Sequence, residues 1–330
     1  MINKNAFNIP VLDSLRAFAA LSVCLYHFVC TTTGFISTTW VLDLFSVGKY
    51  GVQLFFVISG FVIPWAMFHA KFEFKNLFAF MLKRLARLEP PYLFSIVIAL
   101  IILFLREKFL GPQNEHLAIS FKQVALHLGY LIPFFNGYKW LNQVYWTLAI
   151  EFQYYLFIAL LFIPLIRSKL IFRIFIYAAI IALSFVGSAR FLPHWLPVFL
   201  IGITLFLYKA KLVGTKEYYS VTILLVAFCI YKYPVVSVIY TLIPVLFVLF
   251  FEDLKIKGLN FLGKTSYSIY LIHSLIGASF INVLSHSVHS ALGKFFVIVC
   301  GTILTLLSAY AMYRLIENPS KKISANVKYK

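Results

Sequence analysis

Ionisable side chains interrupt the first apolar stretch of the chain, residues 11–30, which holds Asp13, Arg16 and His27. Such a group in the middle of a membrane helix costs about 2.5–3.5 kcal/mol on insertion scales, so each needs a reason to be there. Arg16 and His27 are eleven residues apart. At about 100° per residue they share one helical face, roughly 16 Å apart along the axis. The two side chains, a cation and a potential base, therefore face the same way at different depths of the helix. Alternatively, Asp13 and Arg16 merely neutralise each other.

The composition shows which solvent the chain is built for. It is 62% hydrophobic and 12% charged, with a mean hydropathy of +0.90, and apolar runs recur from end to end. A soluble domain needs more charge to cover its surface, so we expect lipid around this chain. The net charge of +18 then indicates bases collected on the cytoplasmic side rather than nucleic-acid binding. The four cysteines lie in apolar segments without metal-like spacing, and we expect them to be small buried hydrophobes.

Apolar segments that position these side chains follow one another along the whole chain. In lipid each must satisfy its own backbone polar groups, and none alternates as a barrel strand would. We therefore expect an all-α, polytopic transmembrane bundle of about ten helices, forming a single domain over 1–330. The helices are predicted at 11–30, 47–68, 91–105, 144–166, 171–187, 193–208, 219–232, 235–251, 267–285 and 295–314. The pair around Lys232–Pro234 leaves nine or eleven spans open.

The distribution of bases predicts the orientation. Twenty Lys and Arg side chains fall in loops on the side of both termini, against eight on the other side. This ratio places both termini in the cytoplasm. Three further segments follow from it: an amphipathic cytoplasmic segment at 69–90, a long extracytoplasmic loop at 106–143 and a short basic cytoplasmic tail at 318–330. No cleavable signal peptide is expected, since the first apolar stretch continues without a small-residue cleavage site.

Six motifs, in order along the chain, resemble one known family. LDSLRAFAALSVCLYHF is similar to the opening helix of the acyltransferase family 3 membrane proteins, whose signature is an Arg and a His separated by ten residues. Further similar motifs are GVQLFFVISGFVI (51–63), KRLARLEPPY (83–92), WTLAIEFQYYLF (146–157), LGKTSYSIYLIHSL (262–275) and YRLIENP (313–319). Thr147 stands where the family usually has Ser, and Glu89 precedes Pro90 where an apolar residue is common. The chain resembles the stand-alone members that carry no appended hydrolase-like domain.

The resemblance implies a reaction and its partners. It implies a bacterial inner-membrane O-acyltransferase that uses acyl-CoA, usually acetyl-CoA, as co-substrate and needs no metal. The acceptor would be a hydroxyl of an extracytoplasmic carbohydrate or glycolipid, such as lipopolysaccharide O-antigen or exopolysaccharide. Membrane lipids are the other expected partners, and nucleic acid is not. The acceptor hydroxyl, the acyl chain length and the oligomeric state remain open.

Basic residues are the candidates for holding the donor. Coenzyme A is polyanionic and cytosolic, so its phosphates need bases at the inner mouth, and Lys83, Arg84 and Arg87 supply them. Arg84 and Arg87 share a helical face. Arg16 could grip the pantetheine or pyrophosphate, or keep Asp13 ionised. Ordinary anchoring at the inner surface is the alternative for all three bases of the 83–92 stretch.

Two residues, His27 and Glu151, are assigned to the acceptor side. Acyl transfer to an alcohol requires removal of its proton, and a neutral imidazole can accept it, so His27 is the candidate general base. Glu151, one turn into the 144–166 helix, could orient His27 or bind sugar hydroxyls, and a helix-packing hydrogen bond is the alternative. For His273 we expect a structural or lining role. Arg314 and Glu317, at i and i+3, are expected to form an ion pair.

A transporter or exporter of glycan or lipid-linked precursors is the rival reading. Asp13, Arg16 and His27 would then form a proton or substrate pathway. Many transporters contain paired repeats with interrupted helices, and this chain has no such internal similarity. The sequence therefore favours the enzyme.

Overall fold

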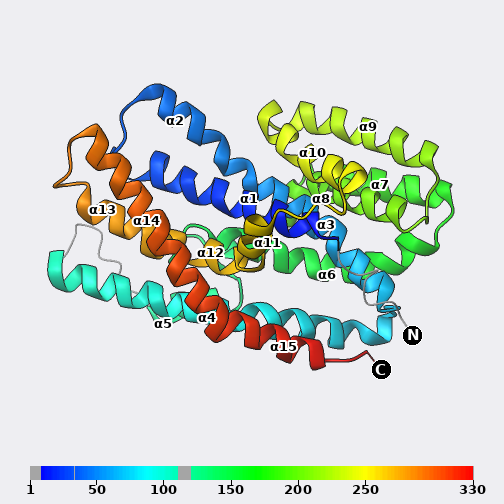
Figure 1. The fold of residues 1–330 in the computed structure, drawn as a ribbon. Helices are drawn as coiled ribbons and strands as arrows, with labels where there is room; N and C mark the ends of the chain where they lie inside the picture. Colours follow the sequence, from blue (N-terminus) through cyan, green and yellow to red (C-terminus); the bar gives the residue numbers. More distant parts are fainter. Residues whose placement is uncertain (1–8, 33, 111–119, 330) are drawn as a thin grey trace.

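The computed structural model describes residues 9–32, 34–110 and 120–329, and in these ranges it contains only helices and the turns that join them (Figure 1). Each of the ten predicted segments is helical. The corresponding elements are α1 (Val11–Tyr26), α3 (Gly51–His69), α4 (Leu77–Leu110), α6 (Tyr145–Arg167), α7 (Leu170–Leu183), α8 (Leu192–Lys209), α9 (Thr215–Lys232), α10 (Val235–Phe250), α12 with α13 (Ser266–Ile272 and Ser279–Leu284) and α14 (Ala291–Met312).

Seven helical stretches in the described ranges are long and apolar enough to cross a membrane. Two further apolar helices, Leu170–Leu183 and Val235–Phe250, are shorter. The chain is therefore an integral membrane protein, with fewer full-length spans than the ten expected from hydropathy. Short helices complete the fold: α2 (Thr39–Ser46), α5 (Phe121–Leu128), α11 (Lys257–Lys264) and α15 (Asn318–Asn326).

Helix α4 joins two elements that the sequence had suggested were separate. The expected amphipathic segment 69–90 and the expected span 91–105 form one continuous helix from Leu77, which runs through Pro90 and Pro91. Proline lacks an N–H, so Pro90 and Pro91 leave the carbonyl oxygens of Ala86 and Arg87, four residues earlier, without their helical partners. The Tyr267 hydroxyl donates to the neighbouring Leu88 carbonyl oxygen at 3.0 Å and connects this turn to α12. Proline is tolerated in membrane helices because neighbouring groups can satisfy the freed backbone.

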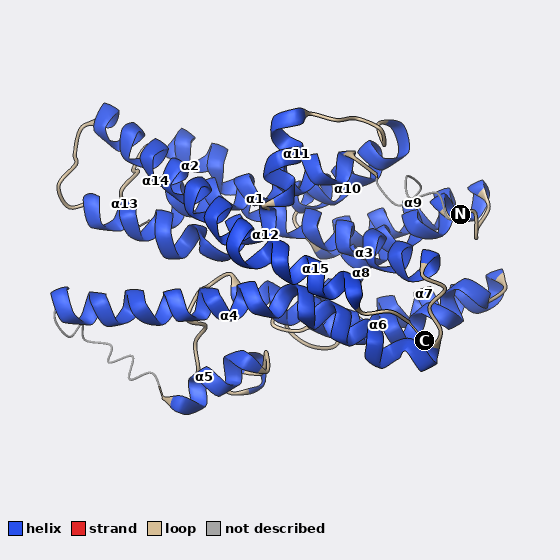
Figure 2. Ribbon diagram, turned by 60° about the horizontal axis from the view of Figure 1, so that its bottom comes forward, coloured by secondary structure: helices blue, strands red, loops and turns tan. Residues whose placement is uncertain are grey.

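The C-terminal segment 318–330 is folded onto the bundle over its described part. Helix α15 lies along the first half of α4 (Figures 1 and 2). The Ser324 hydroxyl donates to the Lys83 carbonyl oxygen at 2.7 Å, and the Lys83 ammonium lies 6.0 Å from the centroid of the Tyr329 ring. The expected basic tail is therefore a helix whose position is fixed against α4.

The long segment after α4 is also partly structured. Residues 111–119 of the expected loop 106–143 lie outside the described residues. Beyond them, α5 packs under α4 (Figure 2), and its buried His127 carries two hydrogen bonds. His127 Nδ1 donates to the Gln123 carbonyl oxygen at 2.7 Å, while Nε2 accepts from the Leu141 N–H at 2.9 Å. The neutral ring thus ties both ends of this segment together.

Glycines allow the central helices to approach closely. Gly60 of α3 and Gly202 of α8 face each other's backbones so tightly that a Cβ on either would collide with the opposite helix. Small residues at such contacts are typical of membrane helix pairs, in which packing and not the hydrophobic effect drives association. Gly263 of α11 lies in the same way against the backbone of Asp13 in α1. This second contact brings the last third of the chain to the ionisable residues of the first helix.

Candidate active site

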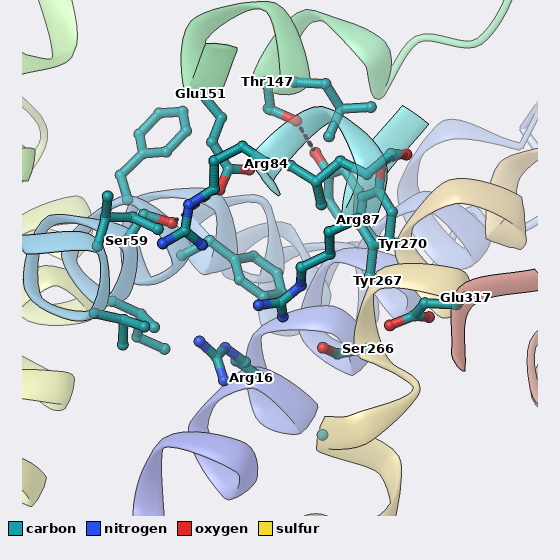
Figure 3. Close-up of a pocket in the computed structure, with 18 of the residues that line it drawn as sticks. Arg16, Ser59, Arg84, Arg87, Thr147, Glu151, Ser266, Tyr267, Tyr270 and Glu317 are labelled. Carbon is teal, nitrogen blue, oxygen red and sulfur yellow. Dashed lines mark hydrogen bonds between the residues drawn. The ribbon is translucent and has the colours of Figure 1, made fainter. Parts of the chain in front are cut away.

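A cavity of about 190 Å³ lies inside the bundle, between α1, α3, α4, α6, α12 and the chain at Glu317 (Figure 3). Its charged lining residues are of both signs. Cations outnumber anions, five to three: Arg16, Arg84, Arg87, Lys264 and Lys321 against Asp13, Glu151 and Glu317. The cavity therefore has a net positive charge and favours an anionic occupant.

Arg84 and Arg87 come from one helix face of α4, and their guanidinium groups point into this cavity (Figure 3). Within the described ranges neither makes an ion pair with a carboxylate. Arg84 Nε is buried without a hydrogen-bond partner. Its guanidinium carbon lies 5.4 Å from the Phe80 ring centroid and 5.8 Å from that of Tyr155. A partly buried cation without a direct ion-pair partner is costly, so the two arginines can take an anion from outside the chain.

Arg16 reaches the same cavity from α1, and Figure 3 shows its guanidinium opposite those of Arg84 and Arg87. It makes a long contact with Asp13, 3.4 Å between Nη1 and Oδ1. The helix from Val11 to Tyr26 is uninterrupted, so the shared face of Arg16 and His27 holds as far as His27. Arg16 thus retains donors free for an additional ligand beyond Asp13.

Glu151 lies in the arginine cavity and not beside His27. Its Oε1 accepts hydrogen bonds from the Ser59 hydroxyl at 3.3 Å and the Tyr155 hydroxyl at 2.5 Å. The orienting contact with His27 considered above is therefore not made in the structure. Lys83, the third expected phosphate ligand, is not among the residues that line the cavity.

Lys321 and Glu317 are charged cavity residues that the sequence-based candidate site did not include. Lys321 of α15 lines the cavity and pairs with Glu317, 2.6 Å between Nζ and Oε1. The other oxygen of Glu317, Oε2, accepts from the backbone N–H and the hydroxyl of Ser268, at 3.2 and 2.6 Å. The ion pair of Glu317 is thus with Lys321, whereas Arg314 was the expected partner. Only the packing of α15 against α4 brings this lysine to the site.

His27 begins a π-helical turn (His27–Thr31) directly after the end of α1. It does not line the cavity. Gln143 Nε2 donates to its Nδ1 at 3.0 Å. Tyr270 stands between the two regions: its ring lines the cavity and lies 5.8 Å from the His273 ring, whose centroid is 5.1 Å from that of His27. The hydroxyls of Tyr270 and Thr147 share a hydrogen bond of 2.8 Å.

Comparison with known proteins identifies the family of this chain. Residues 9–314 match the acyltransferase family 3 model, which describes an acyltransferase domain. The chain belongs to this family. The expected resemblance is thereby confirmed over nearly the whole sequence, and the chain is an acyltransferase by family.

The curated relatives are distant. The chain is 27% identical to the O-acetyltransferase OatA of Staphylococcus aureus strain NCTC 8325, over 95% of this chain and 57% of that protein. It is 29% identical to the putative acetyltransferase ORF330 of Acidianus two-tailed virus, over 81% of this chain and 83% of that protein. The chain thus spans little more than half of the length of the staphylococcal relative. No solved structure matches the fold.

Proposed function

We propose that this protein is an O-acyltransferase of the bacterial inner membrane, which transfers an acetyl group from cytosolic acetyl-CoA to a hydroxyl of an extracytoplasmic glycan. The observation that carries the proposal is the pair Arg84 and Arg87, which line a net positive cavity without a carboxylate partner among the described residues. Phosphate oxygens form strong, charge-assisted hydrogen bonds with guanidinium groups. The 190 Å³ of free space is small for a whole coenzyme, so we assign it to the part of the donor nearest these arginines.

The direction of transfer follows from the distribution of bases. With twenty Lys and Arg side chains on the side of the termini and eight opposite, both termini and α15 face the cytosol, in a bundle of about ten helices. The arginine cavity, next to α15, is then the donor entrance. His27 lies farther toward the outer face, about 16 Å beyond Arg16 along α1. The thioester of the donor extends from the arginine cavity, past Tyr270, toward the acceptor hydroxyl at His27.

His27 is the residue for the proton of the acceptor. As the hydroxyl oxygen bonds to the acyl carbon, the C–S bond breaks, the hydroxyl proton moves to His27, and coenzyme A leaves as a thiolate. The proton of His27 then neutralises the thiolate sulfur, and the ring returns to its neutral form. A histidine whose unperturbed pKa is about 6.5 is suited to both halves of this cycle. Arg16, Arg84 and Arg87 hold the donor while the bond exchange takes place.

Release of free thiol from acetyl-CoA by the purified protein in lipid nanodiscs tests the proposal, with chitotetraose as a hydroxyl probe and water as the background acceptor. Thiol release reports C–S cleavage whichever oxygen receives the acetyl group. We expect turnover by the wild type and a loss of about 10²- to 10⁴-fold in kcat for His27→Ala, because a general base contributes about that factor. His289→Ala, at an exposed histidine remote from the cavity, is the matched control and should be unchanged.

Two outcomes would contradict the proposal. If the wild type releases no thiol from acetyl-CoA, yet vesicles containing it release an entrapped glycan, the protein is a transporter. If thiol release is unaffected by His27→Ala, the base lies elsewhere, and Glu151 is the next candidate for it.

A further inference from the structure

His273 is a fully buried imidazole next to His27 that the proposed reaction does not yet use. Each of the two histidines begins a π-helical turn, His27–Thr31 and His273–Ala278. Such turns are rare, because they strain the helix, and they are frequent at functional sites. Two of them meeting at a pair of imidazoles indicates that the orientation of these rings matters.

The hydrogen bonds of His273 determine where its proton is. Its Nδ1 lies 2.8 Å from the carbonyl oxygen of Tyr270 and 3.2 Å from that of Ile269. Carbonyl oxygens only accept, so Nδ1 must carry the hydrogen. Nε2 is then a bare acceptor, and it is buried without a hydrogen-bond partner. Leaving such an atom unpaired costs about 1–3 kcal/mol.

The hydrogen bonds of His27 give the complementary tautomer. The Gln143 amide nitrogen, which can only donate, lies 3.0 Å from Nδ1. The Thr31 hydroxyl lies 3.2 Å from Nδ1 and 2.9 Å from the His27 carbonyl oxygen, and its single hydrogen can rotate toward either acceptor. Nδ1 of His27 therefore holds the lone pair, and its Nε2 carries the hydrogen. Among the residues that the structure describes, the Nε2–H of His27 has no acceptor and the Nε2 of His273 has no donor.

We propose that His273 is the positioning residue for the His27 base: the two rings lie 5.1 Å apart between centroids without a hydrogen bond in this structure, and during the reaction His273 Nε2 accepts the Nε2–H of His27 and thereby presents His27 Nδ1 to the acceptor hydroxyl. This inference rests on the function proposed above. The hydroxyl displaces the Gln143 amide from Nδ1, gives its proton to Nδ1 as the C–O bond forms, and leaves His27 as an imidazolium. The bond from Nε2–H to His273 then becomes charge-assisted and stabilises that cation. A base oriented by a third group is the general logic of activated catalytic histidines.

Two substitutions separate this role from simple packing. In His273→Asn the shorter amide can still donate to the same backbone carbonyls, but no acceptor remains at the position of Nε2. His273→Gln places an amide oxygen near that position. In the thiol-release assay with acetyl-CoA and chitotetraose, we expect kcat of His273→Asn to fall by about 10- to 100-fold, the equivalent of one charge-assisted hydrogen bond. The KM for acetyl-CoA should stay unchanged, and His273→Gln should recover most of the loss. Ser274→Ala, at the adjacent partly buried residue, is the matched control and should match the wild type.

A double-mutant cycle with His27→Ala gives the decisive readout. If His273 acts through His27, the double variant His27→Ala/His273→Asn is no slower than His27→Ala alone, since residues that act as a unit are not additive. Should the Asn variant fail to fold, His273→Met, which keeps the volume and lacks both nitrogens, has the same expected loss and is used in the cycle.

The inference is overturned if the two losses multiply, or if His273→Asn and His273→Met turn over within twofold of the wild type. Equal loss in the Asn and Gln variants, with a raised KM, would likewise leave His273 as a packing residue. Each of these results leaves the acyl transfer itself intact. Absence of thiol release by the wild type overturns the proposed function, and with it this assignment.

Discussion

Removing the Arg84 guanidinium should weaken donor binding and, at the same time, change the stability of the empty protein only slightly. Replacement by Met keeps an apolar side chain as far as the position of Nε and removes the rest of the guanidinium group. It relieves the buried and unpaired Nε, which is worth about 1–3 kcal/mol. It also loses the contacts of the guanidinium with the Phe80 and Tyr155 rings, at about 0.5–1 kcal/mol each. The sum of these effects is a change in unfolding free energy of about −1 to +2 kcal/mol, where a positive value is stabilising.

The effect on the free energy of coenzyme A binding is larger and is unfavourable. Loss of one charge-assisted hydrogen bond, about 1.5–3 kcal/mol, raises the Kd for coenzyme A by about 10- to 100-fold. At a coenzyme A concentration about 100 times the wild-type Kd, bound ligand stabilises the wild type by about 2.7 kcal/mol. The same concentration should stabilise Arg84→Met by only about 0.4–1.4 kcal/mol. The predicted signature is therefore a Tm without ligand that changes little in either direction and a clearly reduced Tm increase with ligand.

Thermal unfolding of the purified proteins by intrinsic fluorescence, with and without coenzyme A, measures both quantities. Arg167→Met is the matched control, because Arg167 is exposed at the end of α6 and does not line the cavity. It should retain the full ligand-induced increase. A lower Tm of ligand-free Arg84→Met combined with an undiminished coenzyme A effect would refute the reasoning and make Arg84 a structural anchor.

Three further predictions concern orientation, packing and pH. A cysteine introduced at the exposed Ser37 should react with a membrane-impermeant maleimide on intact cells, whereas one at Lys71 should require permeabilisation; the reverse pattern would invert the topology. Gly263→Ala places a Cβ against the Asp13 backbone and should lower stability by about 1–3 kcal/mol, measured as Tm, whereas Gly258→Ala, which faces open space, should be neutral. Burial lowers the pKa of His127; the unfolded segment then binds the extra proton more readily, so its stability is full above about pH 6.5 and falls as the pH decreases below that value. The protection factors of the amides around His127, which are corrected for the intrinsic effect of pH on exchange, should accordingly be lower at pH 5 than at pH 7.5, and equal protection factors at both would contradict the neutral ring.

The sequence by itself determined the class of the protein and the position of its helices. All ten apolar segments proved to be helical, because in lipid the backbone must satisfy its polar groups locally and composition reports this directly. The motifs also gave the family, since Arg16, His27, Arg84 and Arg87 stand at spacings that are visible without any fold. The lengths of the helices were less predictable. Helix α4 runs from Leu77 through Pro90 and Pro91 to Leu110, a continuity that hydropathy does not report.

Only the tertiary structure decided which residues share a site. Glu151 lies with the arginines, and Lys321 reaches them because α15 folds back along α4. His273 comes to 5.1 Å from His27, although most of the chain separates them in sequence. Helical periodicity places residues on a face of their own helix, but the rotation and depth of each helix in the bundle depend on close contacts such as Gly263 against Asp13. Those contacts are non-local, so the neighbourhoods that make the chemistry cannot be read from local spacing.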